Sequence, residues 1–473
     1  MPKTRILCTL GPSTNDVEKI GRLLDAGASA VRVNFSHGDH QAHAASVEMV
    51  RQVSADRERM IPIIADLQGP KVRTGVLADG QPVRLEQGQE FQLVSEEIVG
   101  TASAVSVDYP SLAEDVASGD KILLADGAIG LEVTRLEGKD VVCKALNGGL
   151  LGERKGVNVP GAAMKLPPLT EKDKHDLRFA LSQGVEYIAQ SFVRRAKDIR
   201  LTKNLIQWAG FETPVIAKIE KPQAIENLEE ILEIADGVMI ARGDLGVELD
   251  PWQVPIEQKR IIEAAARWRK PVITATQMLE SMIESPRPTR AEVSDVANAV
   301  FDGSDALMLS GETAVGKYPF EAVAMMAKII ETAEATAAEP KLDLGPAPRE
   351  DDQVSVEVAH SAARLAERLS ARYIVVFTES GFTAQLISKH RPTCPVLALS
   401  RHSEVCRRMK LLWGVRSRPV GEIADLDQLI LTIESVLKSN GWADDNDLVV
   451  VVAGTPFDVG GHTNMVKLHR IGS

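Results

Sequence analysis

The chain has 473 residues, of which 44% are hydrophobic, and a formal net charge of −12 at pH 7. This length predicts about three domains with sizeable cores, and the negative charge argues against bulk binding to nucleic acid or to an anionic membrane. The four cysteines show no C-x-x-C spacing, and no apolar run approaches the roughly 20 residues of a membrane span. Because the N-terminus also lacks a signal-peptide core, we expect a reduced, cytoplasmic protein.

Apolar, strand-like runs alternate with longer helical stretches over residues 1–73 and 165–340. This alternation is typical of a parallel α/β sheet. Roughly eight of the runs end in polar residues, and a TIM barrel has eight strands. The polar ends are Cys8-Thr9, Arg32-Val33-Asn34, Ala65-Asp66, Gln190-Ser191, Lys218-Ile219-Glu220, Arg242-Gly243-Asp244, Thr274-Ala275-Thr276 and Ser310-Gly311-Glu312. Any one of them could be an ordinary turn, but together they predict a (β/α)8 TIM-barrel domain formed by both blocks.

Residues 74–164 interrupt the barrel pattern after its third strand. Short β-like runs occur at 91–94, 122–124, 131–134 and 141–143, with turn pairs such as Asp79-Gly80 and Asp126-Gly127 between them. Runs of this kind are typical of a small antiparallel β-barrel or sandwich. An insertion at this point lies over the barrel mouth, so we expect a lid domain that excludes water when its joints near Arg73 and Lys165 bend.

A third region, residues 341–473, follows an Ala/Glu-rich helix that we expect to end near Glu339. Val354, Val358, Leu365 and Leu369 indicate an amphipathic helix, and apolar runs at 373–377, 396–399 and 448–453 indicate buried strands. This pattern predicts a separate C-terminal α/β domain of ordinary size.

The chemistry of the chain is concentrated in three short runs, residues 217–220, 241–246 and 275–282, each at the end of a predicted strand. They contain Lys218, Glu220, Asp244 and Thr276. In a parallel barrel the carboxyl ends of the strands converge on one mouth, so these residues can meet around a single metal and substrate. Arg32, Arg73, Lys155 and Lys218 would give the same mouth a local basic pocket for a small phosphorylated ligand.

Two other motifs are weaker. Residues 311–317 (GETAVGK) nearly match a phosphate-binding loop, but Tyr318 occupies the place of the magnesium-binding hydroxyl. His37, Asp39, His40 and His43 have spacings that could suit zinc, yet residues 36–39 also fit a loop that leads into a helix cap. We interpret His40 and His43 as surface histidines.

Nine segments of this chain together resemble the pyruvate kinase family, and the resemblance covers almost the whole sequence. The segments are residues 9–13 (TLGPS), 31–38 (VRVNFSHG), 66–75 (DLQGPKVRTG), 155–160 (KGVNVP), 218–220 (KIE), 241–246 (ARGDLG), 274–282 (TATQMLESM), 288–292 (PTRAE) and 308–313 (MLSGET). The resemblance implies a barrel with an inserted lid and a C-terminal effector domain. It also implies transfer of the phosphoryl group of phosphoenolpyruvate to ADP, giving pyruvate and ATP.

The resemblance implies roles for the residues at the barrel mouth. Glu220 and Asp244 match the family's magnesium ligands, with Mn²⁺ as an alternative metal, and Lys218 matches the lysine that stabilises the transferring phosphoryl group. Arg32 matches the arginine that holds the substrate phosphate. Gly243 and Thr276 match residues at the carboxylate end of the substrate, and Thr276 also helps to place the proton donor for the enolate.

Further positions match the nucleotide and monovalent-cation sites of the family. Thr9, His37, Arg73 and Lys155 fall where family members contact nucleotide. Asn34, Ser36 and Asp66 correspond to the potassium ligands of many members. Residues 66–71 read DLQGPK, however, where the potassium-dependent pattern has an acidic last residue. The sequence therefore resembles the potassium-independent branch of the family. We predict that the ammonium group of Lys71 takes the place of the potassium ion.

The C-terminal region carries a candidate effector site at residues 378–383. The hydroxyls of Thr378, Ser380 and Thr383, at the start of a predicted helix, can form a phosphate cradle. Members activated by fructose 1,6-bisphosphate often have a basic residue near this loop, where Glu379 and Phe382 stand here. We therefore expect a sugar or nucleotide monophosphate as effector. The resemblance also implies a homotetramer.

Two other functions stay open from the sequence. A different barrel enzyme that acts on phosphoenolpyruvate, or an enolate-forming lyase, would use the same carboxylates without needing the lid or the C-terminal domain. A non-enzymatic metabolite sensor would keep the effector domain and lose Lys218, Glu220, Asp244 or Thr276. All four are present.

Overall fold

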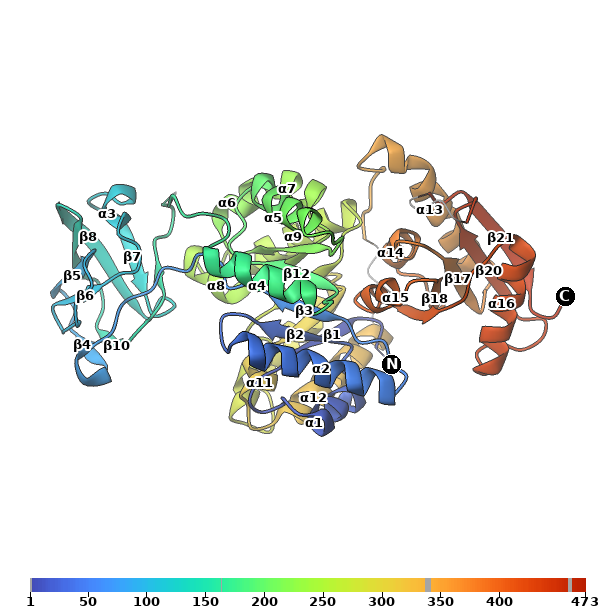
Figure 1. Cartoon of the computed structure of the whole chain (residues 1–473), viewed down its shortest axis with the longest axis horizontal. Helices are drawn as coiled ribbons and strands as arrows, with labels where there is room; N and C mark the ends of the chain where they lie inside the picture. Colours follow the sequence, from blue (N-terminus) through green and yellow to red (C-terminus); the bar gives the residue numbers. More distant parts are fainter. Residues whose placement is uncertain (1, 163, 337–341, 458–461) are drawn as a thin grey trace.

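In the computed structural model, which describes residues 2–162, 164–336, 342–457 and 462–473, a central barrel lies between two smaller domains (Figure 1). Eight parallel strands close the barrel in the order β1-β16-β15-β14-β13-β12-β3-β2. They are β1 (Arg5–Thr9), β2 (Ala30–Asn34), β3 (Ile63–Asp66), β12 (Tyr187–Gln190), β13 (Val215–Ile219), β14 (Gly237–Ala241), β15 (Val272–Ala275) and β16 (Ala306–Leu309). The predicted TIM barrel is confirmed.

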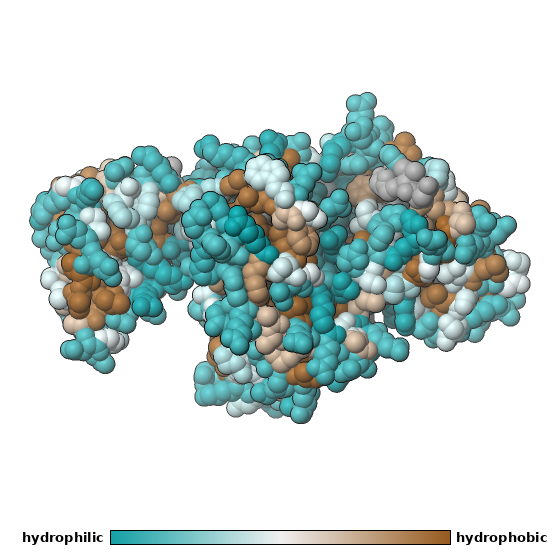
Figure 2. Space-filling model, viewed as in Figure 1, coloured by the Kyte–Doolittle hydropathy of each residue, from teal (hydrophilic) through white to brown (hydrophobic). Residues whose placement is uncertain are grey.

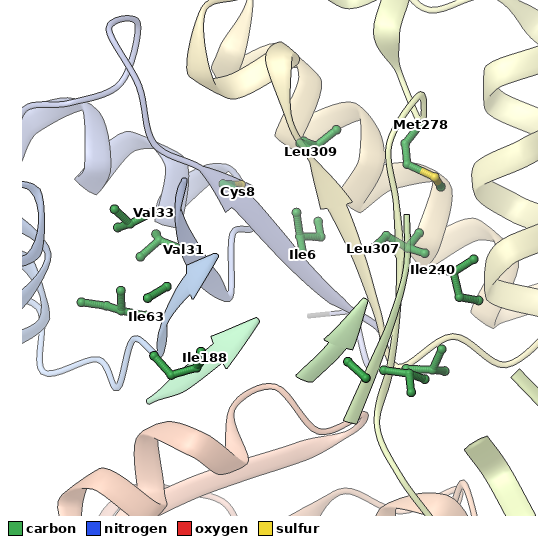
Figure 3. Packing of buried hydrophobic residues seen from close by; sticks show 14 of the residues in the cluster. Ile6, Cys8, Val31, Val33, Ile63, Ile188, Ile240, Met278, Leu307 and Leu309 are labelled. Carbon is green, nitrogen blue, oxygen red and sulfur yellow. The ribbon is translucent and has the colours of Figure 1, made fainter. Parts of the chain in front are cut away.

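Helices surround the barrel and bury apolar faces against its strands. They are α1 (Val17–Ala26), α2 (His40–Asp56), α4 (Glu171–Ser182), α5 (Ala196–Trp208), α6 (Pro222–Glu226), α7 (Leu228–Ile234), α8 (Arg242–Glu248), α9 (Val254–Arg267), η2 (Glu280–Ile283), α10 (Arg290–Phe301), α11 (Gly311–Ala314) and α12 (Pro319–Thr336). Figure 3 shows side chains such as Ile6, Val31 and Leu307, which belong to the buried layer between strands and helices. Thr170 and Asp173 form a capping box that starts α4, and Thr289 and Glu292 form another that starts α10.

The inserted segment leaves the barrel after β3 and returns before α4. It contains η1 (Ala78–Gly80), β4 (Val83–Leu85), β5 (Glu90–Val94), β6 (Ala104–Ser106), α3 (Leu112–Asp115), β7 (Lys121–Leu124), β8 (Ile129–Glu137), β9 (Asp140–Ala145), β10 (Gly149–Leu151) and β11 (Val157–Asn158). Six strands form one mixed sheet, and β4 pairs with β10 around the same apolar core. This lid projects from one side of the barrel (Figure 1). The boundaries at residues 74 and 164 remain predictions.

The C-terminal domain is a five-stranded sheet in the order β19-β18-β17-β20-β21 with helices on both faces. Its elements are η3 (Glu350–Asp352), α13 (Gln353–Arg368), β17 (Tyr373–Phe377), α14 (Phe382–Lys389), β18 (Val396–Ser400), α15 (Ser403–Met409), β19 (Val415–Pro419), α16 (Leu426–Ser439), β20 (Leu448–Ala453) and β21 (Met465–Arg470). The predicted helix end near Glu339 and the domain boundary at 340/341 lie outside the described residues. Figure 2 shows hydrophilic residues over most of the visible face, with hydrophobic patches on each lobe.

Buried charges and one apolar side chain join the C-terminal domain to the base of the barrel. Asp305, which directly precedes β16, accepts hydrogen bonds from Lys389 Nζ and Arg391 Nη2, and all three residues are at most 4% exposed. Leu411 is fully buried in the cluster of side chains that fills the barrel interior. The two domains therefore share a core at this end of the barrel.

Two sequence interpretations are wrong in detail. His43 is not a surface residue, since it is 8% exposed and its ring lies 4.3 Å from that of Phe35. The helix predicted near Val354 exists as α13, but Val354 and Leu369 are 63% and 45% exposed. The buried face of α13 consists mainly of small residues, among them Ala359 and Ala362. Small side chains allow close packing of the helix on its neighbours, and alanine gives a weaker periodic signal than valine or leucine.

Candidate active site at the barrel mouth

A buried network of charges joins residues of β1, β2, β3 and β13 at the barrel mouth. Arg32, in β2, donates from Nε to Asp66 Oδ2 over 2.6 Å and from Nη1 to Thr9 Oγ1 over 3.2 Å. Lys218 Nζ lies 3.1 Å from Asp66 Oδ1. Burial would raise the pKa of Asp66, but the charges of Arg32 and Lys218 outweigh this effect and hold that pKa below its ordinary value. Asp66 thus fixes both cations at one point of the mouth.

Lys218 occupies the centre of this network and is 8% exposed. Its ammonium group donates to Ser191 Oγ over 2.7 Å and lies 3.0 Å from Glu220 Oε1. Burial alone would lower the pKa of Lys218, yet Asp66 and Glu220 raise it above its ordinary value. The lysine is therefore a fixed positive charge, suited to stabilise negative charge that develops beside it.

Glu220 is fully buried, and its Oε2 accepts a hydrogen bond of 2.7 Å from the backbone N–H of Phe192. Its Oε1 is paired with Lys218 Nζ at 3.0 Å. Burial raises the pKa of Glu220, Lys218 offsets this only in part, and the negative charge of Asp244 adds to it. A buried carboxylate whose charge one lysine offsets only in part, near a second carboxylate, fits a hard divalent cation.

No group of three or more His, Cys, Asp or Glu side chains in the described part of the chain is placed to hold a metal. The zinc alternative for His37, Asp39, His40 and His43 finds no support. Asp39 is the N-cap of α2, and His40 Nε2 lies 2.7 Å from Asp176 Oδ1.

Lys71 lies at the joint between barrel and lid and contacts a carboxylate on each side. Its Nζ is 3.1 Å from Asp244 Oδ1 at the barrel mouth and 3.3 Å from Asp126 Oδ1 in the lid. Burial would lower the pKa of Lys71, but the two carboxylates hold it above the ordinary value. Lys71 is therefore a charged member of the site and does not point into solvent. Asn34 and Asp66, two of the predicted potassium ligands, are register partners on β2 and β3, and Ser36 N donates to Asn34 Oδ1 over 3.2 Å.

Gly243 and Thr276 meet at the ends of β14 and β15. The backbone N–H of Gly243 donates to Thr276 Oγ1 over 2.7 Å. Thr276 has φ +68°, a left-handed conformation that is rare for a β-branched residue. Arg242 supports this strained loop with hydrogen bonds to the carbonyls of Ala275 and Thr276. A Cβ on Gly243 would lie 3.5 Å from Thr276 Oγ1, which is an ordinary van der Waals contact. The neighbouring protein atoms therefore do not require glycine at this position, whereas a ligand close to the backbone would.

The four predicted nucleotide-binding residues do not form one cluster. Thr9 is 3% exposed and belongs to the Arg32 network. Arg73 donates from its backbone to Asp108 and from its guanidinium to the carbonyl of Arg154, and both of these partners are in the lid. Lys155 is exposed on the lid, and His37 is exposed beside the barrel mouth.

The predicted effector loop caps α14. Thr378 Oγ1 accepts from Gly381 N over 3.0 Å, and Thr383 Oγ1 lies 2.7 Å from Thr463 Oγ1. Ser380 Oγ accepts a long contact from Phe382 N. Glu379 is paired with Arg401 and with His402 Nε2, at 2.9 Å and 3.0 Å. Glu379, which stands near the place of a basic residue in members activated by the bisphosphate, is therefore in contact with two basic side chains.

Sequence reasoning did not assign roles to three residues that position the site. Ser191 accepts from Lys218, Arg242 anchors the Thr276 loop, and Asp126 contacts Lys71. Ser191 stood at a predicted strand end, which was a usable signal. The sequence indicated Asp126 only as a turn residue. Its contact with Lys71 could not be predicted, because that contact depends on where the lid lies relative to the barrel. The near phosphate-loop motif has a structural use, since Glu312 accepts from the backbone of Leu279 and Ser310.

Family models and relatives agree with this arrangement. Residues 1–323 match the model described as pyruvate kinase, barrel domain, and residues 356–469 match the one described as pyruvate kinase, alpha/beta domain. The chain is 46% identical to a protein named pyruvate kinase 2 from Synechocystis over 474 residues, covering 99% of this chain and 79% of the relative. It is 44% identical to a pyruvate kinase from Corynebacterium glutamicum, covering 99% and 98%.

A solved structure of a pyruvate kinase has the same fold. The crystal structure of a pyruvate kinase from Cryptosporidium parvum superposes with a TM-score of 0.93 at 38% identity, covering 99% of this chain and 96% of the other. Within the described residues, none of the helices has the length and apolarity needed to cross a membrane.

Proposed function

This chain belongs to the pyruvate kinase family, and we propose that its reaction is carried out by the Arg32–Asp66–Lys218–Glu220 network at the barrel mouth. As a pyruvate kinase it transfers the phosphoryl group of phosphoenolpyruvate to ADP and forms pyruvate and ATP. The observation that carries our assignment is that this network aligns two buried cations, Arg32 and Lys218, with the buried carboxylate of Glu220, whose Oε1 lies 3.0 Å from Lys218 Nζ. Phosphoryl transfer depends mainly on such positioning and charge neutralisation.

Glu220 and Asp244 would hold Mg²⁺, with Mn²⁺ as an alternative. The raised pKa of the buried Glu220 carboxyl and the nearby charge of the half-buried Asp244 support this assignment, because two neighbouring carboxylates favour a cation between them. When bound, the metal would neutralise charge on the phosphoryl oxygens. Asp244 is also held by Lys71, which orients its carboxylate toward the joint with the lid.

The remaining mouth residues would act directly on phosphoenolpyruvate. Arg32 holds the substrate phosphate, and Lys218 stabilises charge on the phosphoryl group as it moves. The buried contacts of both side chains with Asp66 support these roles, since preorganised charges need no rearrangement during the reaction. Gly243 and Thr276 bind the carboxylate end, and Thr276 orders the group that protonates the enolate.

Thr9, His37, Arg73 and Lys155 would bind the nucleotide. Two of these residues are on the lid, and Lys71 links lid and barrel through Asp126 and Asp244. A small rotation of the lid would therefore bring Arg73 and Lys155 to the mouth while excluding water. We further propose that Lys71 removes the need for potassium.

Regulation would occur at the loop of Thr378, Ser380 and Thr383. The hydroxyls and the start of α14 support binding of a phosphorylated metabolite. We expect a monophosphate, because residues 378–383 contain no basic side chain to hold a second phosphate. Titration with glucose 6-phosphate, ribose 5-phosphate, AMP and fructose 1,6-bisphosphate tests this expectation, and preferential binding of the bisphosphate would contradict it.

The exposed Trp252 and Ile256 (73% and 65%) support a subunit interface in a homotetramer. We also propose a cytoplasmic location.

A coupled assay of ADP-dependent pyruvate formation from phosphoenolpyruvate, with and without Mg²⁺, tests the catalytic proposal. We expect turnover that requires both ADP and the metal. Pyruvate formation without ADP would favour the lyase alternative, and the absence of turnover with Mg²⁺ present would favour a sensor.

A further inference from the structure

A cavity of about 260 Å³ lies between the base of the barrel and the C-terminal domain. Its barrel wall comes from residues at or just before strands, among them Tyr187 and Asp236, together with Arg269 and Lys270 before β15. Its other wall includes Gln385 of α14. The cavity is thus at the opposite end of the strands from the barrel mouth.

Lys270 lines this cavity without a counter-ion. It is 8% exposed, and its Nζ makes no hydrogen bond and no ion pair with any of the residues that the structure describes. Burial lowers the pKa of Lys270 to about 8, and the more distant charge of Asp236 offsets this only in part. A lysine buried in this way is costly unless an anion joins it.

Two arginines on the same cavity are also incompletely satisfied. Nε of Arg269 and Nε of Arg408 are buried and have no hydrogen-bond partner in the described structure. Arg269 is 4% exposed and uses its other nitrogens to bind the carbonyls of Gly345 and Pro346. These donors leave the cavity wall with unused hydrogen-bonding capacity for an anion.

The carboxylates on the cavity wall are already engaged. Asp236 accepts from Lys203 Nζ and from the backbone of Val215, each over 2.8 Å, and Asp352 pairs with Arg349 at 3.5 Å. Of the four cationic side chains on the wall, Arg349 is therefore paired with Asp352, which leaves Arg269, Lys270 and Arg408 without a carboxylate partner among the described residues. The rest of the wall is largely apolar, with Val356, Phe382, Leu386, Met409 and Leu412 on the side of the C-terminal domain.

We propose that this cavity is a second ligand site, separate from the effector loop, that binds a small phosphomonoester. The phosphate lies against Lys270 and Arg408, and a compact apolar or ring-shaped body lies against Phe382 and Leu386. Ser380, Gly381 and Phe382 belong to both regions, but the hydroxyls of Thr378 and Thr383 do not line the cavity. The two sites can therefore be separated by substitution.

Occupation of this site would act on both domains that form it. Gln385 of α14 donates from Nε2 to the carbonyl of Arg269 over 2.8 Å. Lys270 lies just before β15, whose other end leads into Thr276. Ligand binding would thus change the contact between domains at the base of a strand that supports the active site.

Calorimetric titration with phenyl phosphate tests the proposal on the full chain, with the barrel mouth saturated by phosphoenolpyruvate and Mg²⁺ in the absence of ADP. We expect one site in the wild type, with roughly 10- to 100-fold weaker binding in Lys270→Met and Arg408→Met, as for loss of a hydrogen bond to a charged group. The matched control Lys438→Met and the loop variant Thr383→Ala should bind like the wild type.

Three results would overturn the proposal. Unchanged binding in both cavity variants would show that these cations do not hold the phosphate. Loss of binding in Thr383→Ala alone would assign the ligand to the effector loop, and equal binding of phenol would show a merely apolar cavity. Acetylation of Lys270 in the wild type avoids any folding defect: phenyl phosphate should slow it several-fold, and absence of protection would also count against the site.

Discussion

The ammonium nitrogen of Lys71 lies 3.1 Å from Oδ1 of Asp244, the proposed metal ligand, and 3.3 Å from Oδ1 of Asp126 in the lid. The positive charge that replaces an acidic residue in the potassium-dependent pattern is therefore in direct contact with the carboxylate that we propose as a metal ligand. At an effective dielectric constant of about 20, a unit charge roughly 4 Å away is worth about 4 kcal/mol before desolvation. Such a charge is large enough to matter for the rate.

We predict that the wild type is not activated by potassium and that Lys71→Glu becomes dependent on it. The introduced carboxylate would join Asp126 and Asp244, and three neighbouring anions attract a cation. Turnover should be compared in tetramethylammonium, sodium and potassium buffers at matched ionic strength, with Lys71→Gln as the uncharged control. Strong activation of the wild type by potassium would refute the assignment.

Replacing Lys218 by methionine should lower turnover by about 10²–10³ while phosphoenolpyruvate binding stays comparatively intact, because the lysine is proposed to act where charge moves in the transition state. The rate constant is measured by the coupled assay, and binding by calorimetry with Mg²⁺. Lys221→Met is the matched control, since Lys221 pairs with Glu248 outside the network. Near-native turnover of Lys218→Met would show that its role is structural.

The sequence predicted which residues end the barrel strands, because apolar runs followed by polar residues are local features. It could not predict the pairs that these residues form. The contact of Lys218 with Ser191 joins neighbouring strands whose register is set by the closed barrel, and the contact of Lys71 with Asp126 depends on how the lid is placed. The burial of His43 against Phe35 likewise comes from tertiary packing.

The cavity at the barrel base was not visible in the sequence for the same reason. Arg269 and Lys270 are adjacent, but Arg408 comes from the other domain, and a pair of basic residues before a strand usually indicates a solvated turn. What distinguishes them is the burial of Arg269, of Lys270 and of the Nε atom of Arg408, with no carboxylate paired to them in the described part of the chain.

Stability should depend on pH through His390. Burial, followed by the charges of His360 and Arg269, lowers the pKa of His390 from 6.5 to about 4. Between these values the unfolded chain binds a proton that the folded chain does not, so stability is complete above the unfolded pKa and falls as the pH decreases. The loss should reach about 2 kcal/mol by roughly pH 5.

Urea unfolding between about pH 5 and pH 7.5, followed by tryptophan fluorescence, measures this dependence. His390→Gln should have a flatter profile than the wild type over this range. The exposed His462 gives the control His462→Gln, which should keep the wild-type slope. An unchanged slope in His390→Gln would assign the pH dependence to other groups.

The ion cluster at the base of the barrel should make a large contribution to the contact between domains. Asp305 accepts from Lys389 and from Arg391, whose Nη2 lies 3.0 Å from Oδ1, and none of the three side chains is more than 2% exposed. Asp305→Asn keeps the shape and removes the charge that both cations need. Removing one partner of a buried ion pair costs about 3–5 kcal/mol, because the other charge stays buried without compensation.

Denaturant unfolding of Asp305→Asn should show this loss, whereas Asp445→Asn, which alters an exposed pair with Lys438, should change stability by at most about 1 kcal/mol. The double variant Asp305→Asn/Lys389→Met separates charge from packing. If the uncompensated ammonium group is the cause, Lys389→Met should destabilise the Asp305→Asn background much less than it destabilises the wild type, since the methionine no longer requires a counter-ion. Additive losses in the double variant would mean that the two residues contribute by packing alone, and that charge pairing does not hold the C-terminal domain on the barrel.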